Sequence, residues 1–149
     1  HCVTRRQRQM CIRDRCMCGA VKFEVPCEPF AMLVCHCIDC RAWSASPVNG
    51  ATAYKRDQLT IKKGEDLIKR YTSSEGHNRC WCSVCGGHVF SDHPAYDLVD
   101  VYASVLEGLA FKPGAHVHYA QSILPIKDGL PKFKDFPAEL GGSGEMMDE

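Results

Sequence analysis

Apolar and polar residues alternate over short stretches of this chain, a spacing typical of β-strands with one buried face. The clearest stretch is residues 21–25, where Val21, Phe23 and Val25 alternate with Lys22 and Glu24. Further strands are predicted at residues 30–34, 58–62, 67–72, 78–81, 88–91, 98–103 and 115–119. No long amphipathic helix is evident. The pattern predicts a mainly β fold of short antiparallel strands, interrupted by turns such as the one expected at Asn49-Gly50.

Seven cysteines fall into three clusters, Cys16-x-Cys18, Cys35-x-Cys37-x-x-Cys40 and Cys82-x-x-Cys85. Such short spacings allow thiolates from one tight turn to reach a single cation, and zinc takes four of them in a tetrahedron. Two incomplete pairs together supply four ligands: Cys16, Cys18, Cys82 and Cys85. They predict a closed, structural zinc site with metal knuckles. The alternative is that the Cys-x-Cys pair binds no metal.

The three remaining cysteines, Cys35, Cys37 and Cys40, can cap one face of a second zinc ion and leave its fourth corner open. An open corner accepts an exogenous thiol and presents it as a thiolate, which can add to an aldehyde carbonyl. His36 is adjacent to two of these ligands, so we expect it to hydrogen-bond nearby rather than to bind the metal. The alternative is a second closed site with a fourth ligand from His88, His93 or Cys80.

Cysteine usage also bears on the compartment. The 11 cysteines are an odd number, which leaves at least one thiol unpaired, and their spacings suit metal clips better than long-range bridges. We therefore expect a reducing, cytoplasmic location rather than a disulfide-rich secreted protein. No run approaches the ~20 apolar residues of a membrane span, so no membrane partner is expected.

Charge is uneven at the start of the chain. The formal net charge is zero, but residues 1–15 carry five arginines against one aspartate. Residues 5–15 read RRQRQMCIRDR, which is one reading frame of a sequencing adapter used in transposon-based DNA libraries. We therefore expect residues 1–15 to be a non-native artefact, residues 1–14 to pack poorly, and Cys2 and Cys11 to bind nothing. The alternative is a basic arm for nucleic acid; without it, the nearly neutral body predicts no nucleic-acid partner.

The remaining length suits one domain. Residues 16–140 are expected to form a single zinc-binding catalytic domain. The run Gly141-Gly142-Ser143-Gly144 and the acidic residues after it predict a flexible acidic tail at residues 141–149.

Four motifs occur in a recognisable order: Cys16-Met17-Cys18-Gly19-Ala20-Val21, Cys35-His36-Cys37-Ile38-Asp39-Cys40-Arg41, Arg79-Cys80-Trp81-Cys82-Ser83-Val84-Cys85-Gly86 and Asp128-Gly129-Leu130-Pro131-Lys132-Phe133. Over roughly residues 16–140 the chain resembles the glutathione-dependent formaldehyde-activating enzyme family, which also includes centromere protein V. The resemblance implies an Mss4-like zinc-binding β fold with two Zn²⁺ per chain and glutathione as co-substrate. It implies a structural zinc at the first and third motifs, and a second zinc at Cys35, Cys37 and Cys40 that the glutathione sulfur approaches.

The activity implied by the resemblance is that of a carbon–sulfur lyase, which forms S-(hydroxymethyl)glutathione from glutathione and formaldehyde. The expected partners are thus a small-molecule thiol and aldehyde. His36, Asp39 and Arg41 are the candidate catalytic residues, the first two as general bases. Arg41 and Arg79 are candidates for holding a glutathione carboxylate, because arginine pairs with carboxylates bidentately. Two alternatives are a non-catalytic, zinc-stabilised interaction module similar to centromere protein V, and a thiol redox sensor.

Overall fold

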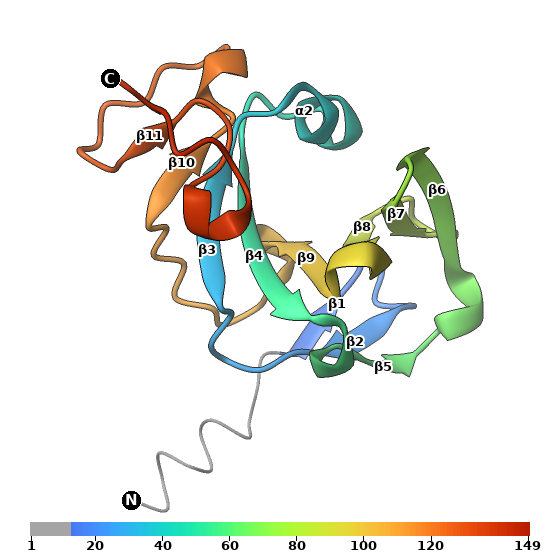
Figure 1. Cartoon of the computed structure of the whole chain (residues 1–149). Helices are drawn as coiled ribbons and strands as arrows, with labels where there is room; N and C mark the ends of the chain where they lie inside the picture. The colour runs from blue at the N-terminus through green and yellow to red at the C-terminus, as the bar shows by residue number, and fades with distance from the viewer. Residues whose placement is uncertain (1–12) are drawn as a thin grey trace, which may run out of the picture. The chain divides into compact units, whose positions relative to one another are not determined.

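The computed structural model describes residues 13–149, and these residues fold mainly into β-strands (Figure 1). They divide into two compact units, and the single domain expected for residues 16–140 stays a prediction. The first unit comprises His1–Phe30, described from residue 13 onward, and Thr52–Ala110; the second comprises Ala31–Ala51 and Phe111–Glu149. Strand β4 (Asn49–Lys55) runs from the second unit into the first. Within residues 13–149, no helix is long and apolar enough to cross a membrane.

The first unit contains a three-stranded antiparallel sheet and a meander. The sheet has the order β1 (Arg13–Arg15), β2 (Lys22–Glu24) and β5 (Thr60–Lys63). The meander joins β6 (Ile68–Ser74), β7 (His77–Cys82), β8 (His88–His93) and β9 (Leu98–Tyr102), each antiparallel to the next. Four short 3₁₀ turns also belong to this unit: η1 (Arg56–Gln58), η2 (Glu65–Leu67), η3 (Pro94–Tyr96) and η4 (Ala103–Val105).

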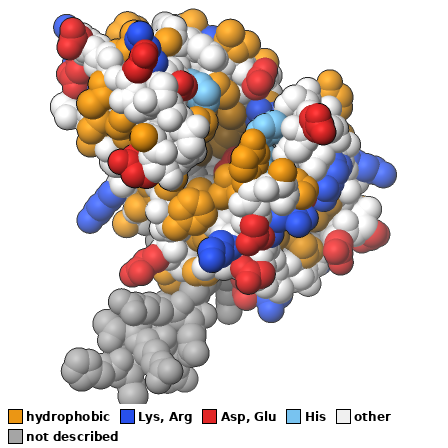
Figure 2. Space-filling view, viewed as in Figure 1, with side chains coloured by type: hydrophobic (Ala, Val, Ile, Leu, Met, Phe, Trp, Pro, Cys, Tyr) orange, Lys and Arg blue, Asp and Glu red, His pale blue; other side chains and the backbone are white. Residues whose placement is uncertain are grey.

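The alternating apolar residues in and beside β2 form part of the core of the first unit, as their pattern predicted. Val21, Phe23 and Val25 are almost fully buried, and Cys80 lies with them. Cys80 is therefore a small apolar core residue, because a buried thiol behaves as a small hydrophobic group. Other apolar side chains stay at the surface among charged groups of both signs, as Figure 2 shows for one face.

The second unit is built on strand β3 (Ala31–Cys35), with β10 (Ala115–Val117) parallel to it and β11 (Lys132–Phe133) parallel to β10. The short strand β12 (Met146–Met147) pairs antiparallel with β11. Beyond β3 the chain enters α2 (Ile38–Ser44), the one α-helix among the described residues (Figure 1). Two 3₁₀ turns, η5 (Tyr119–Gln121) and η6 (Ala138–Leu140), complete the unit.

Three expectations from the sequence, on a turn and on the two ends of the chain, need correction. Asn49-Gly50 opens β4 and is not a turn; Asn49 is buried there. The acidic tail is not free, because Met146–Met147 pairs with β11. The expectation that residues 1–14 pack poorly is wrong for Asp14. This residue is buried in β1 and accepts a hydrogen bond from the Glu107 amide at 3.1 Å. Residues 1–12, with Cys2 and Cys11, lie outside the described part of the chain.

Candidate functional site

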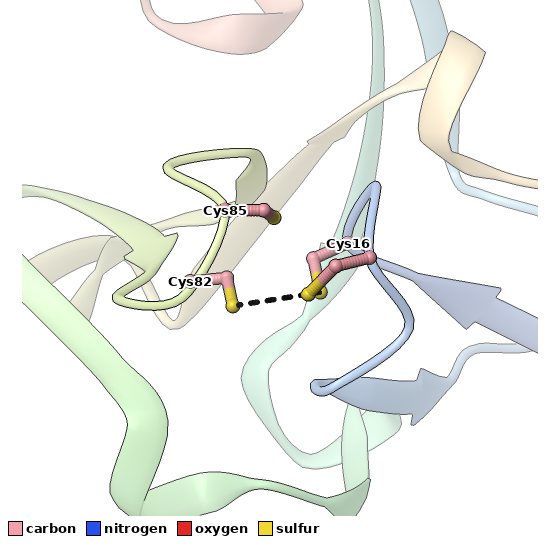
Figure 3. Close-up of side chains that lie close together, drawn as sticks. Cys16, Cys82 and Cys85 are labelled. Atoms are coloured by element: carbon pink, nitrogen blue, oxygen red, sulfur yellow. Dashed lines mark hydrogen bonds between the residues drawn. The ribbon is translucent and has the colours of Figure 1, made fainter.

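Four cysteine sulfurs converge from two loops of the first unit, and all lie within 4.8 Å of one another (Figure 3). This four-cysteine cluster consists of Cys16, Cys18, Cys82 and Cys85. The Sγ of Cys18 lies 3.7 Å from that of Cys16 and 3.9 Å from that of Cys82. With Zn–S bonds of about 2.3 Å, neighbouring sulfurs of a tetrahedron lie about 3.8 Å apart, whereas a disulfide needs about 2.05 Å. The sulfur spacing therefore fits a bound metal ion and not a pair of disulfides.

Backbone amides also point at these sulfurs. The donors and acceptors are Val21 N to Cys16 Sγ at 3.3 Å, Ala20 N to Cys18 Sγ at 3.5 Å, and Gly87 N to Cys85 Sγ at 3.3 Å. Hydrogen bonds from the backbone amides of Cys18 and Gly87 lower the pKa of Cys85 to about 6. Amides that favour thiolates, gathered around four close sulfurs, suit a cation at their centre. The donor set fits the structural zinc that the spacing predicted.

The second group of sulfurs lies where β3 ends and α2 begins. Cys35 is the last residue of β3, Cys37 caps α2, and Cys40 lies in its first turn. Their sulfurs are within 4.8 Å of one another, and we refer to them as the three-cysteine cluster. Cys35 is buried, while Cys37 and Cys40 are only half-buried. Two of the three donors are thus partly accessible.

Among the described residues of the second unit, no fourth cysteine, histidine or carboxylate joins the three-cysteine cluster. The residues considered as closing ligands, His88, His93 and Cys80, all belong to the first unit. His88 instead stacks on Tyr102, with ring centroids 4.1 Å apart, and His93 pairs with Asp100. Within its own unit, the cluster therefore offers three donors and not four.

The three sulfurs are electrostatically unfavourable neighbours in the absence of a cation. The nearby sulfurs of Cys37 and Cys40, followed by burial, raise the pKa of Cys35 far above its ordinary value. A divalent cation reverses this effect, since a coordinating thiol loses its proton outright. The Cys40 amide already donates to Cys37 Sγ at 3.2 Å. A set of three convergent thiols with an amide donor is chemically suited to zinc.

Arg41 and Gln121 hold the loop that carries this cluster. Arg41 donates through Nε to the His36 carbonyl at 3.0 Å and through Nη2 to the Gln121 carbonyl at 2.9 Å. The Gln121 side chain accepts a hydrogen bond from the Ile38 amide at 2.8 Å. Arg41, a candidate for contacting glutathione, is therefore already engaged by the backbone through two of its nitrogens.

The other candidates occupy different positions. Asp39 is exposed in the first turn of α2, beside the cluster in sequence. Arg79 lies half-buried on β7 in the first unit, so a joint role with Arg41 stays a prediction.

His36 is fully buried, and its ring begins a hydrogen-bonded chain. Its Nε2 lies 2.8 Å from Nδ1 of His116, whose Nε2 lies 2.8 Å from Oδ2 of Asp128; Oδ1 of Asp128 accepts from Lys132 Nζ at 2.6 Å. Burial and the nearby positive charges lower the pKa of His36 to about 4, so the ring is neutral. A buried ring bonded to protein groups supports the expected local hydrogen-bonding role, and not direct contact with a substrate.

The sequence patterns did not indicate this chain of side chains. Residues 115–119 were predicted to form a strand, which would place His116 and His118 on one face. His116 is instead fully buried on β10, whereas His118 leaves the strand with φ +52° and packs against Phe136. The sequence signal for this hydrogen-bonded chain is the Asp128-Gly129-Leu130-Pro131-Lys132 motif, which brings Asp128 and Lys132 together.

The fold and these clusters define a mainly β protein with two groups of thiols that could each hold a metal ion. The chain matches the family described as glutathione-dependent formaldehyde-activating enzyme over residues 11–121, a span that includes all seven clustered cysteines. The protein belongs to this family.

The chain is also similar to a further protein and to a solved structure. A stretch of 71 residues is 30% identical to the Schizosaccharomyces pombe protein "Uncharacterized lyase C29B12.13", covering 48% of this chain and 50% of the relative. The match thus spans about half the length of that relative. A crystal structure of a Rhodobacter sphaeroides protein has the same fold, with a TM-score of 0.56 and 22% identity, covering 66% of this chain and 90% of that one.

Proposed function

We propose that this protein is a zinc-dependent carbon–sulfur lyase that adds the thiol of glutathione to formaldehyde and gives S-(hydroxymethyl)glutathione. The observation that carries the proposal is the unequal division of sulfur between four donors in one cluster and three in the other. Four sulfurs complete a tetrahedral zinc site, which is typical of structural metals, whereas three leave one position for a reactant. Membership of the formaldehyde-activating family and the lyase name of the S. pombe relative support the same reaction class.

The proposed chemistry needs no oxidant or reductant. The thiol sulfur forms a bond to the carbonyl carbon, the π bond of the C=O group breaks, and the thiol proton ends on the new hydroxyl oxygen. A zinc ion at the three-cysteine cluster would supply a Lewis acid that lowers the pKa of the thiol. Cys35, Cys37 and Cys40 would hold that ion.

The candidate residues have separate roles in this proposal. Arg41 and Gln121 keep the ligand loop in place through their backbone contacts. Asp39, exposed beside the cluster in α2, is the residue proposed to relay the proton. Arg79, on β7 of the first unit, stays a candidate for contacting a glutathione carboxylate, because arginine pairs with carboxylates bidentately.

The test combines metal analysis with exchange measurements. We expect two zinc ions per chain, one of them displaced or mobilised by glutathione. We also expect the protein to accelerate the exchange, measured by NMR, between the free reactants formaldehyde and glutathione and their adduct. Cys37→Ser should lose one zinc and the acceleration. Cys27→Ser, a cysteine outside both clusters, is the matched control and should keep both. Two tightly held zincs with no effect of glutathione and no acceleration would instead favour a non-catalytic interaction module.

A redox sensor makes a different prediction in the same experiment. An oxidant would release zinc from the three-cysteine cluster, a reductant would restore it, and formaldehyde exchange would be absent in every metal state.

A further inference from the structure

The second unit contains a buried polar chain that the proposed chemistry does not use directly. It runs from His36 through His116 and Asp128 to Lys132, and we refer to it as the His36 chain. His36 and His116 are 0% exposed and Lys132 is 1% exposed. Lys132 also donates to the Leu130 carbonyl at 2.9 Å and to the Glu149 carboxylate at 3.1 Å. Burying three such polar side chains is costly unless each is hydrogen-bonded, so their retention in a small unit calls for a role.

The direction of each hydrogen bond follows from the carboxylate. Asp128 accepts from Lys132 and from the Leu130 amide at 3.1 Å, and these contacts together with His116 hold the pKa of Asp128 well below its usual range. An ionised carboxylate only accepts, so His116 donates to it through Nε2. We assign Nδ1 of His116 as the acceptor of the hydrogen bond from Nε2 of His36. We assign one tautomer to each ring on this basis.

Both the ring and the backbone of His36 are fixed. Its amide donates to the Val117 carbonyl at 3.1 Å on β10, and its carbonyl accepts from Arg41. The ring is bonded to His116, the neighbour of Val117 on the same strand, and lies edge-on to Tyr119 with centroids 4.8 Å apart. The residue between Cys35 and Cys37 is therefore held by contacts to β10 and η5 on its ring side and to α2 on its carbonyl side.

We propose that His116, Asp128 and Lys132 are positioning residues for the three-cysteine cluster. By fixing the ring of His36 they fix the Cys35–Cys37 segment, so that the sulfurs converge before a metal ion binds. The proposal rests on the metal site of the proposed function but concerns metal affinity and not turnover. Removal of side chains that hold metal ligands in place through hydrogen bonds typically lowers metal affinity 10–100-fold. Donors that are already in place also avoid the entropic cost of ordering a loop when the metal binds.

The test is a cobalt titration of the whole chain, monitored through sulfur-to-cobalt charge-transfer absorption. The spectrum of Cys37→Ser gives the contribution of the four-cysteine cluster, and its subtraction isolates the three-cysteine cluster. His116→Leu, which removes both ring contacts, is expected to weaken cobalt binding at the three-cysteine cluster by about 10–100-fold and to leave the four-cysteine cluster unchanged. His116→Gln, which keeps one donor and one acceptor, should recover part of this affinity.

Two further variants keep the test decisive. Asp128→Asn preserves the size of the side chain and weakens the hydrogen bonds of the His36 chain. This variant replaces His116→Leu in the test if His116→Leu does not fold. Asp100→Asn breaks a comparable contact, between Asp100 and His93 in the first unit, and should leave cobalt affinity at the three-cysteine cluster unchanged. Equal affinity at that cluster in the wild type, His116→Leu and Asp128→Asn overturns the positioning role and leaves the proposed function standing. No cobalt at that cluster in the wild type overturns the metal chemistry of the proposed function itself.

Discussion

Asp92 and Arg56 form a bidentate ion pair in the first unit, with Nε to Oδ1 at 2.7 Å and Nη2 to Oδ2 at 3.2 Å. Arg70 adds a third contact to Oδ2 at 3.2 Å. The Asp92 side chain is only 6% exposed, whereas the two guanidinium groups are about half-exposed. The buried member of the cluster is therefore the carboxylate, and its removal affects three hydrogen bonds at once.

Asp92→Asn should lower the free energy of unfolding by about 1.5–3 kcal/mol, the usual range for hydrogen bonds to a charged group. Glu24→Gln is the matched acid-to-amide control. The Glu24 carboxylate meets Lys62 at 3.5 Å with both side chains about half-exposed, so its loss should cost less than about 1 kcal/mol. Urea denaturation of both variants with metal bound compares the two costs. Similar losses in the two variants would show that burial of Asp92 adds nothing.

The four-cysteine cluster gives a second prediction. Cys82→Ser should abolish metal binding there and destabilise the first unit by several kcal/mol, because structural zinc sites contribute on the order of 10 kcal/mol. Cys80→Ala, at a buried cysteine outside both clusters, should cost about 1–2 kcal/mol and leave the metal content unchanged. Thermal unfolding together with a zinc count per chain separates the two effects. Equal metal content in Cys82→Ser and the wild type would contradict the assignment of this cluster.

The cysteine clusters and most strands could be predicted because they depend on local signals. Ligand spacing of one or two residues is visible in the sequence, and the alternation around Phe23 marks a strand with one buried face. The described residues also include strands too short for such a signal, such as the two-residue strand β11. Helix α2 was missed because it has only seven residues, buries none of them fully, and starts at a cap formed by the Cys37 sulfur.

The polar part of the site could not be predicted because it depends on pairing between distant strands. His116 is opposite Val34 only because β10 runs parallel to β3, and parallel partners are joined by long connections that local patterns do not specify. Alternation on a short strand correctly suggested a strand near residue 116 but not that both of its faces are covered. His118 then departs from the strand through a left-handed conformation, which no periodicity indicates.

A third prediction concerns pH. Burial by itself would lower the pKa of His93, but the hydrogen bond and charge of Asp100 on β9 outweigh it and raise that pKa overall. The other groups facing the ring are His77, whose Nδ1 lies 2.8 Å from Nδ1 of His93, and Arg79, whose positive charge acts in the opposite direction; both are on β7. A raised pKa in the folded state means that protonated His93 stabilises the fold fully below the unfolded value of about 6.5. This stabilisation is lost as the pH rises through the folded value.

The measurement is the difference in free energy of unfolding between the wild type and Asp100→Asn, followed from pH 6 to pH 9. The difference should be largest at the acidic end and should shrink as the pH rises, without vanishing, since neutral His93 can still donate to Asp100. A difference that grows with pH would mean that the pKa of His93 is lowered in the folded protein.

The last prediction compares two glycines of the first unit that share a left-handed conformation, Gly64 with φ +76° and Gly108 with φ +84°. A Cβ at Gly64 would lie 2.2 Å from the Ala20 carbonyl oxygen, whereas a Cβ at Gly108 would meet nothing within 4 Å. Gly108→Ala should therefore cost only the strain of a left-handed alanine, about 1–2 kcal/mol. Gly64→Ala should cost about 1–3 kcal/mol more, because backbone must move to relieve the overlap. Denaturant midpoints for the two variants measure this difference, and equal midpoints would show that the loop at Gly64 does not approach Ala20 in solution.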